Sequence, residues 1–211
     1  MGVVAFEWAE VGDNQLTLVM NRDNWANREI SRASRDVRSD SLSGRCKDNG
    51  GTWFAISSKG RVAFLMSKTL LEDKVDKDGG SELYPIDFMK SNVSPEEFAD
   101  HVARCAKDDK LDEKNNGWSY SLIVADLTLN SMVHIRKPHI LAPDVLTETV
   151  PFGVHTLSPD GGLDSTDATR DLCLRDYFSQ MIGVTNPQDF PCGEATTDSF
   201  SDWGKPSTNT V

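Results

Sequence analysis

The stretch Leu18-Val19-Met20-Asn21-Arg22-Asp23 is an apolar run that passes directly into a polar, charged turn. Ahead of it, residues 3–8 form a second run of strand-forming residues. Gly12-Asp13-Asn14 between the runs is a turn signal, so the two runs predict an N-terminal β-hairpin. We expect the first strand to be central and buried, with Phe6 and Trp8 on one face by the two-residue period of a strand.

The same signals recur along the chain and predict further hairpins and helices. Residues 52–57 with 61–66, and residues 121–127 with 131–137, read as two more hairpins. Ser94-Pro95-Glu96-Glu97 combines an N-cap serine, a proline at the first helical position and a capping-box glutamate, which predicts a helix to about residue 106. A second helix is expected over residues 164–182, ending at Gly183. Together these elements predict an α/β (α+β) fold with mostly antiparallel sheets.

Length and composition indicate how many domains the chain has and which classes of partner are unexpected. The length of 211 residues fits one domain, which we place at residues 1–183. Residues 184–211 are rich in Pro, Thr, Ser, Asp and Gly and are expected to be irregular or disordered. The net charge of −11 argues against binding nucleic acid, because phosphate backbones repel an acidic chain. No apolar run approaches the roughly 20 residues that a transmembrane helix needs.

The cysteines and histidines show no metal-like spacing. None of the four cysteines, Cys46, Cys105, Cys173 and Cys192, belongs to a Cys-x-x-Cys pair, so we expect free thiols in a reducing compartment. His134 alternates with apolar residues and is expected to face solvent or a partner on the sheet. We expect neither a metal site nor a cofactor.

Two readings remain open for the aromatic residues. Trp53 is expected to pack in the core. Alternatively, Trp53 lines an apolar ligand pocket together with Phe6 and Trp8. Residues 25–40, dense in Arg, Ser and Asp, are expected to form an ordered surface loop.

Several motifs, taken in order, resemble one family. The stretch from Leu18 to Asp23 resembles the signature of the transport and Golgi organisation 2 (NRDE) family, in which an apolar strand runs into Asn-Arg-Asp-Glu. Further resemblances follow in the family's order: Gly50-Gly51-Thr52-Trp53-Phe54-Ala55-Ile56-Ser57, Gly60-Arg61-Val62-Ala63, Gly80-Ser81-Glu82-Leu83 before the first helix, Leu122-Ile123-Val124-Ala125-Asp126-Leu127, and Leu163-Asp164-Ser165. The similarity runs from about residue 3 to about residue 182.

The resemblance implies a fold and a set of cellular roles. The family is grouped with the N-terminal nucleophile (Ntn) hydrolases, which implies a four-layer α-β-β-α sandwich. Its members are linked to Golgi organisation, protein secretion, mitochondrial lipid metabolism and intracellular haem movement. This implies a small apolar or haem-like ligand and a cytoplasmic location, with Golgi or mitochondrial association. The family pattern stops near Ile182, which suggests a truncated or alternative C-terminus.

The catalytic pattern of such a hydrolase is incomplete here. The family places a cysteine directly after the initiator methionine, where its thiolate attacks a carbonyl and its α-amine serves as base. This chain has Gly2 at that position. By resemblance, Asp23 would orient the amine and Arg22 would steady the nucleophile or a substrate carboxylate. The alternative reading makes Arg22 and Asp23 a structural ion pair, while Asn21 caps a turn.

Three more positions depart from the family. Ser67, Ser121 and Thr156 stand where it has asparagines, whose amides are natural oxyanion donors. We therefore expect a non-catalytic binding or trafficking protein whose vestigial site includes Gly2 and whose binding candidates are Asn21, Arg22, Asp23 and Trp53. Two alternatives remain: an amide or thioester hydrolase with an unrecognised nucleophile, and a truncated product without a stable function of its own. The sequence leaves the oligomeric state open.

Overall fold

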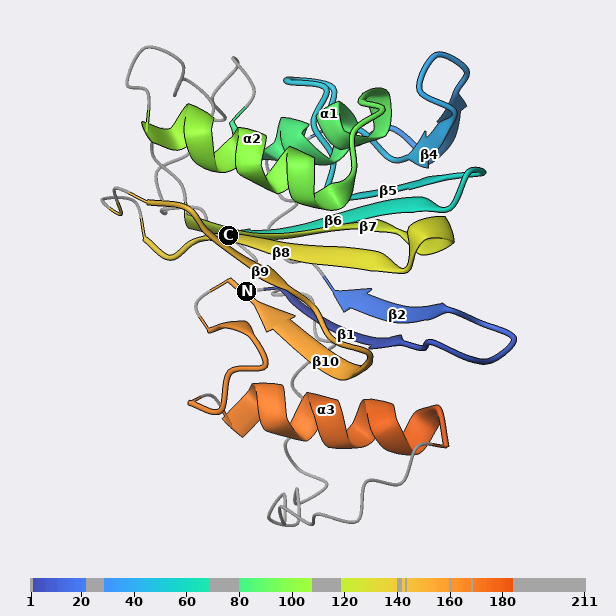
Figure 1. The fold of residues 1–211 in the computed structure, drawn as a ribbon, viewed down its shortest axis with the longest axis vertical. Helices are drawn as coiled ribbons and strands as arrows, with labels where there is room; N and C mark the ends of the chain where they lie inside the picture. Colours follow the sequence, from blue (N-terminus) through green and yellow to red (C-terminus); the bar gives the residue numbers. More distant parts are fainter. Residues whose placement is uncertain are drawn as a thin grey trace, which may run out of the picture.

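The computed structural model describes residues 2–21, 29–68, 80–107, 119–139, 142, 144–159, 161–167 and 169–183. In these residues the chain forms two antiparallel sheets and three α-helices (Figure 1). The mixed α+β class predicted from the sequence is therefore confirmed. The expected irregular tail, residues 184–211, lies outside the described residues.

The smaller sheet contains the first strand. Its order is β11-β10-β1-β2, with bounds Gly162–Leu163, Gly153–Ser158, Val3–Trp8 and Leu16–Asn21. β1 lies between β10 and β2, and Phe6 and Trp8 are both buried on the same face. The predicted central, buried first strand and its hairpin with β2 are thus confirmed.

The larger sheet has the order β3-β4-β5-β6-β7-β8-β9. The bounds are Ser34–Asp36, Ser41–Ser43, Phe54–Ser57, Arg61–Lys68, Ser119–Asp126, Ser131–Lys137 and Leu146–Thr149. The β5–β6 and β7–β8 hairpins confirm the second and third predicted hairpins.

Five strands were not foreseen: β3, β4, β9, β10 and β11. The expected loop over residues 25–40 is partly wrong, because β3 pairs with β4 there, while residues 25–28 lie outside the described residues. β9 is exposed at all four positions, and β10 mixes glycine, histidine and threonine with apolar residues. Neither run shows the apolar alternation by which a half-buried strand is recognised.

Each sheet carries helices on its outer face (Figure 1). α1 (Tyr84–Lys90) and α2 (Pro95–Lys107) pack on the seven-stranded sheet, and α3 (Thr169–Met181) packs on β10 and β1. Alternate residues of β6 enter two different cores. Ala63 and Leu65 belong to the helix-side core, with Trp53, Tyr84, Phe98 and Leu122 among its members. Val62, Phe64 and Met66 belong to the shared core, with Val4, Phe6, Trp8, Ile123, Met132 and Leu157.

The start of α2 follows the predicted capping box. The Glu97 backbone N–H donates to Ser94 Oγ at 3.2 Å, and the Ser94 N–H donates to Glu97 Oε2 at 3.0 Å. Two backbone donors of the first turn, which have no partner within a helix, are thereby satisfied.

The predicted start of the last helix is wrong. α3 begins at Thr169 and not at Asp164. Asp164 has a left-handed backbone (φ 50°), and its carboxylate accepts bonds from His155 and from the Thr156 N–H. These tertiary bonds hold residue 164 in a loop. The predicted stop at Gly183 is confirmed by its φ of +77°.

The cysteines differ in part from the expectation of free thiols. Cys46 and Cys105 are free, whereas Cys173 is disulfide-bonded. Cys192 lies outside the described residues. The absence of a Cys-x-x-Cys pair could not reveal this bond, because a disulfide depends on the distance between Cα atoms and not on sequence spacing.

Replacing Ser94 by alanine should lower the free energy of unfolding by about 1 kcal/mol, the usual effect of losing an N-cap side chain. Ser94→Asp should retain most of the stability, because aspartate caps equally well. Urea unfolding followed by circular dichroism measures both variants. Equal losses for the two would mean that the capping bond contributes nothing.

Candidate functional site

Gly2 is buried and immediately precedes β1, the strand that lies between β10 and β2 in the smaller sheet. Val3 lies opposite Asn21 of β2, and Val4 is paired on both sides, with Met20 of β2 and Leu157 of β10. Glycine brings no side chain to this position. The residue that precedes the first strand therefore carries neither a thiol nor a hydroxyl.

The Asn-Arg-Asp motif is described only at its first residue. Asn21 ends β2 and is exposed. Directly paired residues share a face of a sheet, and Val4 faces the shared core, so Val3 and Asn21 face away from that core. Arg22 and Asp23 lie outside the described residues, and their expected roles remain predictions.

Trp53 is buried in the helix-side core. Phe6 and Trp8 belong to the shared core, on the other side of the seven-stranded sheet. The structure therefore does not bring the three aromatic residues into one pocket.

The three positions that depart from the family lie on different faces. Ser67 follows Met66, whose side chain enters the shared core, so Ser67 faces the helix side. Ser121 pairs with Met66 and faces the shared core. Thr156 pairs with Ala5, which alternates with core residues Val4 and Phe6, so it faces away. Among these three positions, only Ser121 reaches the space between the sheets.

Ser121, near the start of β7, pairs with Arg136, near the end of β8. Figure 1 shows that β1 begins at this same end of the inter-sheet space. At the opposite end of this space the β1–β2 hairpin meets the end of β7, where the Gln15 side chain donates to the Leu127 carbonyl at 3.3 Å. The Arg136 guanidinium lies directly against Gly162 of β11, where an added Cβ would come within 2.9 Å of it. A cationic side chain thus lies between the two sheets.

Two buried histidines, one from each sheet, are each paired with a carboxylate. His134 Nδ1 lies 2.8 Å from Glu148 Oε1 on the neighbouring strand β9. His155 Nδ1 lies 2.7 Å from Asp164 Oδ2, and its Nε2 lies 2.9 Å from the Pro151 carbonyl oxygen. His134 has the sheet partner that was expected, but its ring is 1% exposed. Neither pair is predicted from the sequence, because neither β9 nor the loop at Asp164 shows a recognisable sequence pattern.

The surroundings lower the pKa values of two of these groups, His134 and Asp164. Burial lowers the pKa of His134 and outweighs the opposing effect of Glu148. Burial alone would raise the pKa of Asp164, but the hydrogen bonds from His155 and the Thr156 N–H prevail, and that pKa lies below its ordinary value. The Asp164 carboxylate is therefore held in its charged form.

Several buried polar atoms lack a hydrogen-bond partner among the described residues, including Ser121 Oγ and His134 Nε2. The register makes Ser121 and His134 diagonal neighbours, because Ser121 pairs with Arg136 and His134 pairs with Ile123. No hydrogen bond joins the two side chains. This serine, histidine and glutamate are thus arranged near one another without the nucleophile-to-base bond that activates a serine.

Two other kinds of site were sought in the same residues. No group of three or more His, Cys, Asp or Glu side chains in the described ranges is placed to hold a metal ion. None of the helices in that part of the chain is long and apolar enough to span a bilayer.

The model of the transport and Golgi organisation 2 family matches residues 1–189. The chain belongs to this family. No curated protein matches it. The family match includes Gly2, the Asn-Arg-Asp motif and α3, and it extends past Ile182, where the motif resemblance ended.

Replacing Asp164 by asparagine should lower the free energy of unfolding by about 1–3 kcal/mol at pH 7, because His155 loses a charged partner. A carboxyl with a depressed folded pKa stabilises the fold above its unfolded pKa, here near 3.8, and this contribution is lost as pH falls through the folded pKa. The difference in free energy of unfolding between the natural protein and the variant should therefore become smaller below about pH 4. Urea unfolding from pH 7 to pH 3 measures it, with exposed Glu10→Gln as control. A difference in free energy of unfolding that does not change with pH would contradict the lowered pKa of Asp164.

His134 should produce a different pH dependence. Its folded pKa lies below the ordinary value of 6.5, so the unfolded chain takes up a proton first and stability falls as pH drops below about 6.5. His134→Gln should remove this component, so that its stability relative to the natural protein improves between pH 8 and pH 5.5. Exposed His139→Gln is the matched control. If both variants follow the natural protein across this range, His134 does not titrate on unfolding as we expect.

Proposed function

We propose that this protein is a non-catalytic member of the transport and Golgi organisation 2 family, which binds a ligand on a scaffold inherited from Ntn hydrolases. The observation that carries the proposal is Gly2, buried at the start of β1, where the family pattern places a nucleophilic cysteine. The position directly precedes a central strand and is buried, while the reactive group is missing.

The packing supports the inherited scaffold. α1 and α2 cover one sheet, α3 covers the other, and the shared core contains residues of both sheets (Figure 1). We take this order as the four-layer α-β-β-α sandwich of Ntn hydrolases. In this interpretation Gly2, which directly precedes the central strand β1, stands at the position of the nucleophile.

Chemistry at Gly2 cannot replace the thiol. If Met1 is removed, residue 2 offers an α-amine, which is largely protonated at neutral pH because such amines have pKa values of about 7.7–8.0. Acylation of the amine would give a stable amide and not a labile thioester, so turnover would stop after one event.

The alternative, a hydrolase with another nucleophile, would rest on Ser121. Its hydroxyl lies near His134, which is paired with Glu148. Against this reading, Ser121 is completely buried, and its Oγ makes no hydrogen bond to the described part of the chain. A serine without a base in contact is a poor nucleophile.

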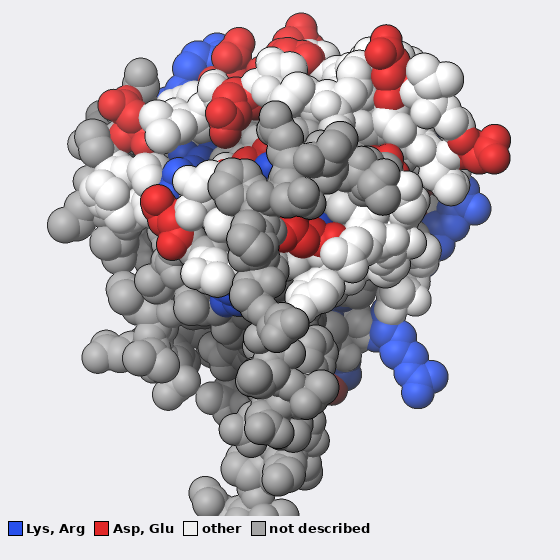
Figure 2. Space-filling view, turned by 90° about the horizontal axis from the view of Figure 1, so that it is seen from below, with Lys and Arg blue, Asp and Glu red and all other residues white. Residues whose placement is uncertain are grey.

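The ligand and the location follow from the family alone and are part of the proposal. We expect a small apolar or haem-like ligand, and a role in Golgi organisation, secretion or the handling of haem or lipid, in the cytoplasm or at the Golgi or mitochondria. Nucleic acid is not an expected partner, since the net charge is −11. Figure 2 shows acidic and basic side chains interspersed on the described part of one face, with no continuous basic patch.

The decisive experiment compares the natural protein with Gly2→Cys. The natural protein should show no burst of covalent acyl-enzyme with activated esters, amides or thioesters, as measured by intact mass. Gly2→Cys should also remain nearly inert, because the oxyanion donors of the family are absent at Ser67, Ser121 and Thr156. Gly2→Ala controls for disturbance of the buried start of β1.

Two outcomes would decide against the proposal or refine it. Robust hydrolysis by the natural protein, abolished by Ser121→Ala, Arg22→Ala or Asp23→Ala, would establish the hydrolase alternative. Rapid acylation of Gly2→Cys alone would show that the remainder of a catalytic site is intact and that only the nucleophile was lost. Mass spectrometry of small molecules that copurify with the protein would then identify the ligand class.

A further inference from the structure

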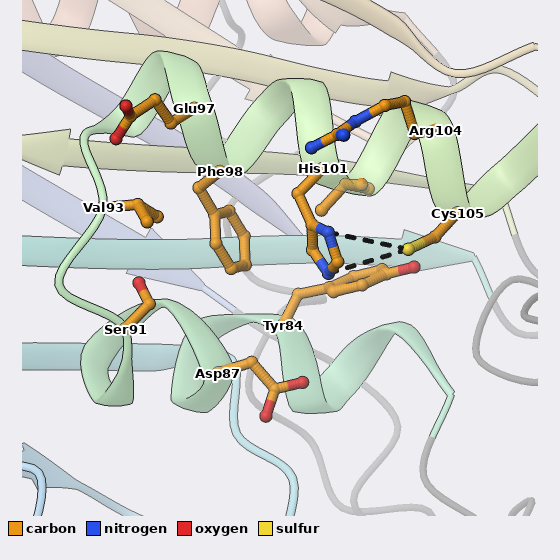
Figure 3. A pocket seen from close by; sticks show the side chains of 10 residues that line it. Tyr84, Asp87, Ser91, Val93, Glu97, Phe98, His101, Arg104 and Cys105 are labelled. Carbon is orange, nitrogen blue, oxygen red and sulfur yellow. Dashed lines mark hydrogen bonds between the residues drawn. The ribbon is translucent and has the colours of Figure 1, made fainter.

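A groove lies between α1 and α2, on the outer side of the seven-stranded sheet (Figure 3). Its volume is about 750 Å³, within the range of about 300–1,000 Å³ that holds small molecules. Tyr84, Phe98 and Val102 give it an apolar lining. The sheet separates this groove from the shared core and from Gly2, so an inference about it does not depend on the proposed function.

One wall of the groove carries a thiol beside an imidazole. His101 and Cys105 are four residues apart in α2 and therefore share a face of the helix. Cys105 Sγ lies 3.6 Å from His101 Nε2 and 3.8 Å from Nδ1. Figure 3 shows both side chains on the groove side of α2, near the ring of Tyr84. Cys105 is free and partly exposed, and His101 is exposed.

The other free thiol of the described residues has the opposite surroundings. Cys46 is 1% exposed, and its sulfur lies 3.8 Å from the Asp48 carboxylate. A thiolate reacts, and a thiol does not, so a base within hydrogen-bond distance and access from solvent favour reaction. A carboxylate neighbour and burial both oppose it. The two cysteines therefore form an internal comparison of a reactive and an inert setting.

We propose that Cys105, with His101 as its base, is a modification site that undergoes thiol–disulfide exchange with small disulfide compounds entering the groove. The Cys105 proton passes to a His101 nitrogen, and the thiolate attacks one sulfur of the disulfide. A new S–S bond forms at Cys105 as the original S–S bond breaks, and the departing thiolate takes the proton from His101. Cys105 is oxidised and one half of the small disulfide is reduced to a thiol, so no further oxidant is needed.

The charged groups around the groove fit a small and weakly charged guest better than a large anion. Asp87 and Glu97 contribute negative charge, and Arg104 contributes positive charge. Glu97 is already engaged by the Ser94 N–H, and Arg104 Nε donates to the Asp100 carbonyl. The apolar lining therefore contacts the body of the guest, while Cys105 and His101 act on its sulfur.

The test uses the full chain, purified without reductant, with 2-hydroxyethyl disulfide, a small uncharged disulfide, at pH 7 as the probe. Intact mass and peptide mapping should find one mixed disulfide, on Cys105, forming at least about tenfold faster than any on Cys46. Cys105→Ser should abolish it, whereas Cys46→Ser should leave its rate unchanged. Equal labelling of Cys46 and Cys105 would overturn the proposal.

The role of His101 is tested by its own variant and by pH. His101→Gln should slow labelling of Cys105 at pH 7 by about tenfold or more, because general bases commonly contribute that much. The deficit should close above about pH 9, where cysteine thiols ionise without a base. His139→Gln, an exposed histidine elsewhere, should have no effect. A rate for His101→Gln equal to that of the natural protein at pH 7, with the fold retained by circular dichroism, would refute the assignment.

Discussion

The burial of β6 on both of its faces is the constraint on which the rest of the structure depends. Successive side chains of a strand point to opposite faces, so a strand that is apolar at consecutive positions must be covered twice. Ala63 and Leu65 are covered by α1 and α2, and Val62, Phe64 and Met66 are covered by the smaller sheet. Each large buried side chain contributes roughly 1.5–3 kcal/mol, compared with about 0–1 kcal/mol for an exposed ion pair. The shared core, and not the surface charges, therefore fixes how the two sheets pack.

That packing also determines what the candidate site contains. Phe6 of β1 packs against Phe64 of β6 with ring centroids 5.3 Å apart, which places the first strand against the larger sheet. As a result Gly2, Ser121 and Arg136 belong to the same end of the inter-sheet space, although they are far apart in sequence. The same packing brings His134 and His155 into the interior, where carboxylates pair with their Nδ1 atoms. The interior is thus polar at places where a purely structural core would be apolar.

The two regions of chemical interest lie on opposite sides of the seven-stranded sheet. At the inter-sheet end, Gly2 brings no reactive side chain to the start of β1. The α1–α2 groove has a thiol and a base in contact, on a helix whose start is fixed by its capping box. A chain without a reactive side chain at residue 2 can therefore still present one elsewhere, since α2 is held by its own apolar face against β8.

Short-range sequence signals were sufficient to predict several local elements. The apolar alternation of residues 3–8, the turn at Ser58-Lys59-Gly60 and the capping box at Ser94 depend on neighbours a few residues away, and each was recognised. The ordered motifs likewise identified the family and the missing thiol at Gly2. Only the tertiary structure decided the roles of His134, Asp164 and Thr156, because their partners and faces depend on strand order and on the packing of two sheets. Asp164 shows the reason most directly: local propensity favoured a helix there, but bonds from His155 and Thr156 hold it in a left-handed loop.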